Sequence, residues 1–122
     1  MAKTKFVPAT TNNITKAIIN LLRSEGHSAS RVNTQGQYDG KLKTWRKSGS
    51  TKGVFDIISC IKGRNGLGRF LSIDIKKGND KLNKDQIVFM KGVRDAGGIA
   101  LEIESYAQFV EWYELFKRHN ED

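Results

Sequence analysis

Two β-branched segments separated by an Asn-Gly pair constrain the fold of this chain most strongly. The segments VFDIISCI (54–61) and RFLSIDIK (69–76) have the composition of buried strands. The linker between them contains Asn65 and Gly66, a favoured pair for a tight hairpin turn. We therefore predict two neighbouring antiparallel strands in which residue numbers that sum to about 131 lie opposite each other. Asp56 would then lie opposite residue 75.

Hydrophobic periodicity on both sides of this hairpin predicts three helices and two further strands. They are a helix over 11–25, a strand over 27–33, a helix from about 83 to 96, a strand over 99–104 and a helix over 106–119. Asn83 and Gln86 have the spacing of a capping box at the start of the second helix. The strand–helix–strand unit from 69 to 103 should form a right-handed parallel crossover. The order predicts an α/β fold with a small mixed β-sheet flanked by helices, in a single domain over 1–122.

Charge is distributed unevenly along the chain. The sequence has 21 Lys and Arg against 13 Asp and Glu, a formal net charge of +8. Residues 1–101 hold 19 basic and 7 acidic groups, whereas residues 102–122 hold 2 and 6. A field of this kind attracts polyanions such as nucleic acids, and the alternative is a basic protein without such a partner.

A long glycine-containing segment, 34–53, shows neither a helical nor a strand period and is interpreted as a long loop or a loosely paired hairpin. Between Gly40 and Gly53 it carries five cations, one tryptophan and no acid. These residues are Lys41, Lys43, Trp45, Arg46, Lys47 and Lys52. A cationic loop with an aromatic side chain can contact phosphates and stack on an unpaired base. The alternative is a solvated loop whose Trp45 packs into the core.

The sequence shows neither a signal-peptide apolar region nor a membrane-spanning run, which sets an expectation about cellular location. The N-terminal residues turn polar before a signal-peptide apolar region develops, and no apolar run approaches the roughly 20 residues needed to cross a bilayer. The single cysteine, Cys60, has no intramolecular disulfide partner, and we expect it to pack as a small apolar residue. We expect a soluble, cytoplasmic protein without a membrane partner.

Two aspartates interrupt the predicted hairpin. Side chains alternate along a strand, so Asp74 and Lys76 share one face of the second strand while the other face packs against a helix. The hairpin brings Asp56 and Asp74 to the same strand end. Two such acids repel each other, and the usual remedies are a shared proton, a lysine or a divalent cation. The alternative is an Asp–Lys surface ion pair on an edge strand.

A divalent cation at this position would have a specific use. Mg²⁺ favours oxygen ligands and keeps several waters, which suits phosphodiester hydrolysis. Lys76 could orient the attacking water and stabilise the transition state.

The combination of these features resembles the PD-(D/E)XK nuclease superfamily, in particular its virus-type replication-repair nuclease (VRR-NUC) domains. The likeness covers nearly the whole chain in the family's order. It is carried by RVN at 31–33, KGVFDII at 52–58, GRFLSIDIK at 68–76, KLNKDQIVFMKGVRDAGGIA at 81–100 and the closing helix.

The resemblance implies a restriction-endonuclease-like core and a metal-dependent DNA endonuclease. By this likeness Asp56, Asp74 and the backbone carbonyl of Ile75 would bind Mg²⁺ or Mn²⁺. Lys76 would be the catalytic lysine, and Gln86 would support the site from its helix. Arg31 and Lys77 join the basic loop as candidate contacts to nucleic acid.

The chain departs from the family pattern at two places. Phe55 stands where the family usually has a proline. The family often carries a glutamate near the start of the first helix, where this chain has Asn13 and its polar neighbours, and no acid occurs between residues 1 and 24. Asn13 is the residue that could bind a metal-bound water there.

The resemblance also sets expectations about partners and two alternatives. Stand-alone domains of this family resemble Holliday-junction resolvases, so we expect branched DNA as the substrate and a homodimer that uses exposed parts of the terminal aromatic helix. Small domains of this kind often resemble phage proteins, which would place the chain in the host cytoplasm. The runner-up is a non-catalytic nucleic-acid-binding module with a degenerate site, supported by the missing helix acid. A small protein-interaction domain would leave the loop charges unexplained.

Overall fold

The computed structural model describes residues 10–32, 37–39, 41, 44–46 and 52–119, with only the backbone described at 37–39 and 44–46. Within these ranges the chain forms three helices and six strands. The helices are α1 (Thr11–Ser24), α2 (Lys84–Asp95) and α3 (Tyr106–His119). The strands are β1 (Ser28–Arg31), β2 (Gln37–Asp39), β3 (Thr44–Arg46), β4 (Ile57–Lys62), β5 (Gly68–Ile75) and β6 (Ile99–Ile103).

The predicted hairpin forms the centre of a four-stranded mixed sheet with the order β1-β4-β5-β6. β4 pairs antiparallel with both β1 and β5, whereas β6 pairs parallel with β5 after the chain has passed through α2. The predicted α/β class, the mixed sheet with flanking helices and the parallel pairing of the crossover strands are therefore confirmed.

The register of the hairpin differs from the prediction by one residue. Ile57 lies opposite Ile73, so Asp56 aligns with position 74 rather than 75. The reason is the turn: the N–H of Gly63 donates to the carbonyl of Leu67 (2.9 Å), and the N–H of Gly66 donates to the carbonyl of Gly63 (3.0 Å). These bonds close a three-residue loop in which Gly66 takes a left-handed φ of 81°. The shift places the two predicted carboxylates directly beside each other.

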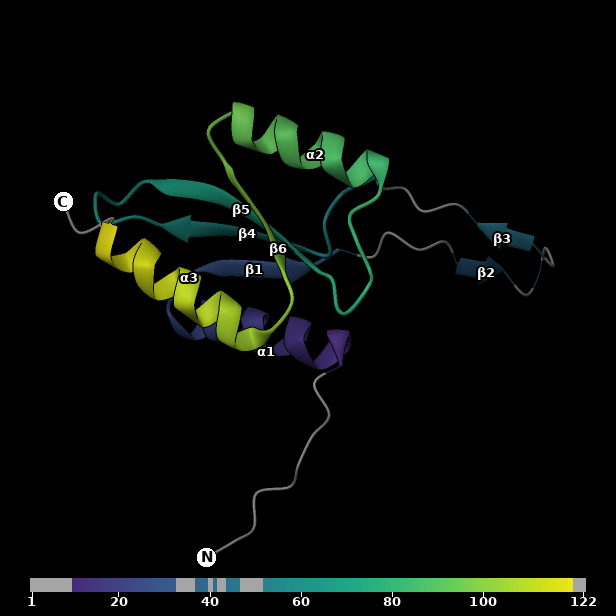
Figure 1. Ribbon diagram of the computed structural model, residues 1–122, viewed down its shortest axis with the longest axis horizontal. Helices are drawn as coiled ribbons and strands as arrows, with labels where there is room; N and C mark the ends of the chain where they lie inside the picture. The colour runs from purple at the N-terminus through teal and green to yellow at the C-terminus, as the bar shows by residue number, and fades with distance from the viewer. Residues whose placement is uncertain (1–9, 33–36, 40, 42–43, 47–51, 120–122) are drawn as a thin grey trace, which may run out of the picture.

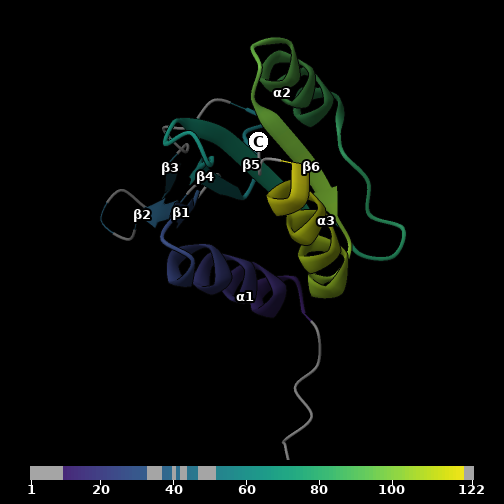
Figure 2. The ribbon, with the colours of Figure 1, turned by 90° about the vertical axis from the view of Figure 1, so that its left-hand side faces the viewer.

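The sheet lies between two helical layers (Figures 1 and 2). α1 and α3 cover one face and α2 lies on the other. The α1/α3 face contains most of the core, in which Ile18, Leu22 and Phe109 are fully buried against strand residues such as Ile57 and Ile73. α2 has no fully buried residue, although the ring of Phe89 lies 5.1 Å from that of buried Phe55. The α2 layer therefore covers a less apolar face of the sheet, and this face carries Asp74.

Cys60 does not pack as expected: it is exposed. Ile57, Ser59 and Ile61 take the buried positions of β4, so alternation places Cys60 on the opposite face of the strand. Its sulfur is close to Gly68, where an added Cβ would lie 2.6 Å from Sγ.

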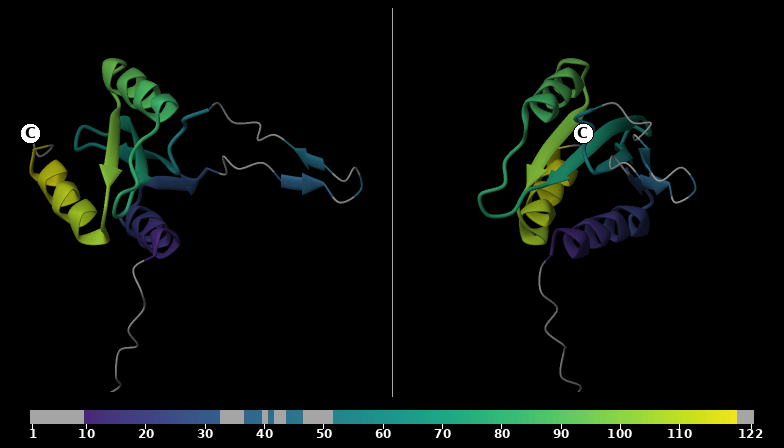
Figure 3. Two further views of the ribbon diagram at one scale, coloured as in Figure 1. Left: turned by 45° about the vertical axis from the view of Figure 1, so that its right-hand side comes forward. Right: turned by 90° about the vertical axis from the view of Figure 1, so that its right-hand side faces the viewer.

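The segment predicted as a loop or a loosely paired hairpin contains the antiparallel pair β2–β3. Figures 1 and 3 show this pair lying away from the four-stranded sheet, beyond the end at which β1 finishes and β4 begins. Of the helices in the described part of the chain, none is long and apolar enough to cross a membrane.

Candidate active site

Two aspartates lie side by side at the end of the central hairpin. Asp56 immediately precedes β4, and Asp74 is the penultimate residue of β5. The backbone N–H of Asp56 donates to Oδ1 of Asp74 at 3.2 Å. The side chain of Asp74 is fully buried, whereas Asp56 is half-buried. The structure thus brings together the two acids that the sequence singled out.

Lys76 and Gln86 both contact the second oxygen of Asp74. The Lys76 ammonium lies 3.2 Å from Oδ2, and Nε2 of Gln86 donates to the same atom at 3.3 Å. The side chain of Lys76 is only 14% exposed. All four residues to which the sequence assigned a catalytic role therefore occupy one site.

Gln86 reaches Asp74 because it is held at the first turn of α2. Asn83 and Gln86 form the predicted capping box: Oδ1 of Asn83 accepts from the Gln86 N–H (2.9 Å), and Oε1 of Gln86 accepts from the Asn83 N–H (3.0 Å). Since the amide oxygen is engaged in the cap, the amide nitrogen is turned toward Asp74. The start of α2 is thus coupled to the orientation of the buried carboxylate.

A surface ion pair on an edge strand does not describe this site. β5 is an interior strand of the sheet, and Asp74 is 0% exposed. A buried carboxylate is costly unless it is paired and hydrogen-bonded, and Asp74 has partners on both oxygens. That alternative interpretation of Asp74 and Lys76 was wrong.

Burial and, after it, the neighbouring negative charge dominate the electrostatics of Asp56. Burial first, and then the charge of Asp74 and a hydrogen bond with it, raise the pKa of Asp56 to about 6. Lys76 and Arg31 oppose this rise without cancelling it. Asp56 is therefore the member of the pair that lacks a sufficient counter-charge at neutral pH.

Sequence reasoning missed three positions that shape the site. Asn12, in the first turn of α1, accepts a hydrogen bond from the guanidinium of Arg31 at the end of β1. Asp80 lies 3.8 Å from the Lys76 ammonium, a contact that the four-residue spacing could have indicated. Gly53 has a φ of 88°, and a Cβ there would lie 2.3 Å from the carbonyl oxygen of Asp85. Gly53 thus allows the chain before Asp56 to approach the start of α2.

The donor set of the pair suits a hard divalent cation. Within the described residues there is no group of three or more His, Cys, Asp and Glu side chains that could hold a metal ion. Mg²⁺ does not need one, because it is commonly held by one or two carboxylates and several waters. Two crowded carboxylates, one with a raised pKa, are the arrangement that a divalent cation would relieve. Coordination by the Ile75 carbonyl stays a prediction.

The candidate nucleic-acid contacts fall into two groups. Arg31, Lys41, Lys52 and Lys77 are exposed. Lys43 and Lys47 lie outside the described residues, and the side chains of Trp45 and Arg46 in β3 are likewise outside the described part.

Comparison with models of known families, with curated proteins and with solved structures finds no match to this chain. The site itself combines a buried carboxylate, a second carboxylate beside it, a lysine and an amide, a set suited to metal-assisted hydrolysis.

Proposed function

We propose that this chain is a metal-dependent DNA endonuclease of the VRR-NUC type that hydrolyses phosphodiester bonds. The observation that carries the proposal is the buried Asp74, which contacts the backbone of Asp56 on one oxygen and Lys76 and Gln86 on the other. A purely structural carboxylate does not need a second acid beside it, since the second acid raises the cost of both charges.

Each residue has a defined task in this proposal. Asp56 and Asp74, with the Ile75 carbonyl, would hold Mg²⁺ or Mn²⁺. A cation of this kind lowers the pKa of a bound water and stabilises negative charge on a phosphate. Lys76 orients the attacking water and offsets charge that develops on the phosphate, and Gln86 holds the Asp74 carboxylate in place.

The surroundings of the site support a nucleic-acid substrate. Arg31 is exposed, and its positive charge partly opposes the rise in the pKa of Asp56, so the two groups are close enough to interact. A phosphate drawn to Arg31 would therefore be close to the carboxylate pair. The backbone N–H of Val32, the next residue, donates to the Asp56 carbonyl at 2.7 Å, which holds the end of β1 at the site. Branched DNA as the preferred substrate, a homodimer that cuts two strands and a location in the host cytoplasm rest on the resemblance.

A cleavage assay tests the proposal. Labelled four-way junction, flap, single-stranded and linear duplex DNA are incubated with wild type in Mg²⁺, Mn²⁺ or EDTA. Asp74→Asn preserves the shape of the buried side chain and should abolish cutting while DNA binding persists. Asp95→Asn removes an exposed α2 carboxylate and serves as the matched control. Absence of cutting by wild type with either cation, or full activity of Asp74→Asn, would contradict the proposal.

One observation favours the non-catalytic binding module as the second candidate. The first turn of α1 carries no acid. In that case the wild type and Asp74→Asn should bind DNA with the same salt dependence and neither should cut it. Cutting gained by Asn13→Glu would then identify the missing carboxylate as the reason.

A further inference from the structure

An apolar groove lies between α2 and the sheet, on the face of the sheet that carries Asp74. Its volume is about 440 Å³, and it is lined by Phe70, Phe89, Gly92, Val93, Ala96 and Gly98. None of these six side chains is charged or polar. An added Cβ at Gly92 would meet nothing within 4 Å, so the α2 wall is open there. The groove is therefore an apolar surface next to the polar candidate active site.

Phe70 connects this groove to the carboxylate pair. Side chains alternate along β5, so Phe70, Ser72 and Asp74 lie on one face, and the four residues from 70 to 74 span about 13 Å. Phe70 is 41% exposed, whereas Ser72 and Asp74 are fully buried. Cys60, opposite Phe70 on β4, is also exposed, because α2 packs over β6 and no described helix covers β4 on this face (Figure 2). A ligand that extends from Asp74 along this face reaches Phe70.

Of the two aromatic rings in the groove, only that of Phe70 is available to a ligand. Phe89 packs against the buried Phe55, with 5.1 Å between the ring centroids. Phe70 has no ring partner within the described chain. An exposed ring without an internal partner is a surface on which a planar group can stack.

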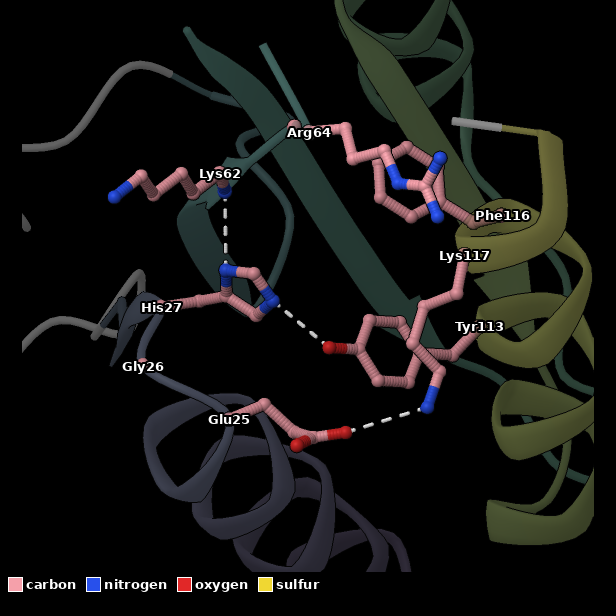
Figure 4. Close-up of a pocket in the computed structure, with 9 residues that line it drawn as sticks. Glu25, Gly26, His27, Lys62, Arg64, Tyr113, Phe116 and Lys117 are labelled. Carbon is pink, nitrogen blue, oxygen red and sulfur yellow. Dashed lines mark hydrogen bonds and ion pairs between the residues drawn. The ribbon is translucent and has the colours of Figure 1, made fainter. Parts of the chain in front are cut away.

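Two cations lie at the end of this face away from the carboxylate pair. Lys62 is the last residue of β4 and shares a strand face with Cys60, and Figure 4 shows its ammonium pointing away from His27. Arg69 donates from Nε to the carbonyl of Gly97 at 3.0 Å, which fixes its guanidinium beside the α2–β6 turn. Among the described residues neither the Lys62 ammonium nor the Nη groups of Arg69 have a partner. Both cations are therefore free to contact an anion.

A strand of nucleic acid with unpaired bases fits this combination. Proteins that bind single strands combine cations that contact the backbone with aromatic rings on which successive bases stack. An apolar small molecule would leave Lys62 and Arg69 without a counter-charge. The groove is also continuous with the candidate active site, so one strand can contact both.

We propose that Phe70 is a stacking platform for unpaired bases next to the scissile phosphate, and that Lys62 and Arg69 contact phosphates of the same strand. This inference rests on the proposed nuclease and names its substrate class, which is a flap or single strand rather than an intact duplex. Bases within a duplex are paired and stacked on their neighbours, so they do not reach the ring.

Fluorescence anisotropy in EDTA tests the inference by measuring how the full chain binds a labelled oligothymidylate and an abasic strand with the same number of phosphates. Phe70→Leu keeps an apolar side chain but removes the ring. It should weaken oligothymidylate binding at least about fivefold and leave abasic-strand binding within about twofold of wild type. Lys62→Gln should weaken binding of both strands by a similar factor and lower its salt dependence. Tyr106→Leu removes a 38% exposed ring at the start of α3 and is the matched control, with both affinities unchanged.

Three results would overturn the inference. One is Phe70→Leu binding of oligothymidylate within about twofold of wild type, and another is an equal loss of affinity for the abasic strand. The third is a wild type that sediments as a dimer while Phe70→Leu sediments as a monomer, because this face would then be an interface between two copies of the chain.

The same titrations distinguish this inference from the proposed nuclease activity. They contain no divalent cation, and Asp74→Asn should give the wild-type pattern. Absence of cutting together with ring-dependent binding would therefore contradict the nuclease alone. Metal-dependent cutting together with ring-independent binding would contradict the stacking platform alone.

Discussion

Replacing Asp56 by Asn should stabilise the fold near neutral pH. Folding raises the pKa of Asp56 from 3.8 to about 6, chiefly through burial and then through Asp74. Between these two values the folded chain binds more protons than the unfolded chain, so the contribution of Asp56 to stability falls as the pH rises from about 4 to about 6. Above that window the ionised carboxylate is a constant penalty, which Asn does not carry.

The magnitude follows from the two pKa values. Their difference corresponds to a loss of about 3 kcal/mol in the free energy of unfolding when no discount is made for solvent screening. Asp56 is only half-buried, so solvent screening reduces the expected effect to about 1–1.5 kcal/mol. The Asn variant should therefore unfold a few degrees above wild type at pH 7.5 and at nearly the same temperature at pH 4.

Urea and thermal unfolding in EDTA measure this difference directly. Asp95→Asn, at an exposed position, is the control and should change stability little at either pH. Two results would refute the claim that burial and Asp74 destabilise the ionised Asp56 carboxylate. One is an Asp56→Asn variant that is no more stable than wild type at pH 7.5. The other is a gain in stability over wild type that is the same at pH 4 as at pH 7.5.

Three further perturbations follow from the same structure. Mn²⁺ should raise the unfolding temperature of wild type but not of Asp56→Asn, since the cation binds the folded pair; equal shifts in both proteins would contradict this. Lys76→Gln should lower the cleavage rate about 100-fold or more with DNA affinity within about twofold in a gel-shift assay, and an unchanged rate would remove Lys76 from the chemistry. Gly53→Ala should lose more stability in urea than Gly66→Ala. Both residues have positive φ, which costs about 1–2 kcal/mol for Ala. Of the two, only Gly53 would place its Cβ against backbone, 2.3 Å from the Asp85 carbonyl oxygen. Equal losses of stability would show that the backbone around Asp85 moves to accommodate the Cβ.

Local patterns were sufficient to predict most of the fold. The β4–β5 hairpin and the α2 capping box depend on residues close together in sequence, and both were predicted. The parallel pairing of β6 was predicted from the general rule for strand–helix–strand units. The one-residue error in register has a local cause as well. An Asn-Gly pair occurs in both two-residue and three-residue hairpin loops, and only the hydrogen bonds of Gly63 distinguish them.

The parts of the site that were missed depend on tertiary contacts. The Arg31–Asn12 contact joins residues 19 positions apart, and no periodic pattern indicates it. Gly53 was interpreted as part of a loop, although its role is the approach to Asp85.

The most direct test of the central claim, that Asp56 and Asp74 form the metal centre of a nuclease, is Mn²⁺-dependent cleavage of a labelled four-way junction by Asp56→Asn beside wild type. The account predicts a variant that is more stable than wild type at pH 7.5 and yet does not cut the junction at any Mn²⁺ concentration at which wild type does. Wild-type rates in Asp56→Asn would contradict it, because the more stable variant would then cut without the carboxylate that the account requires.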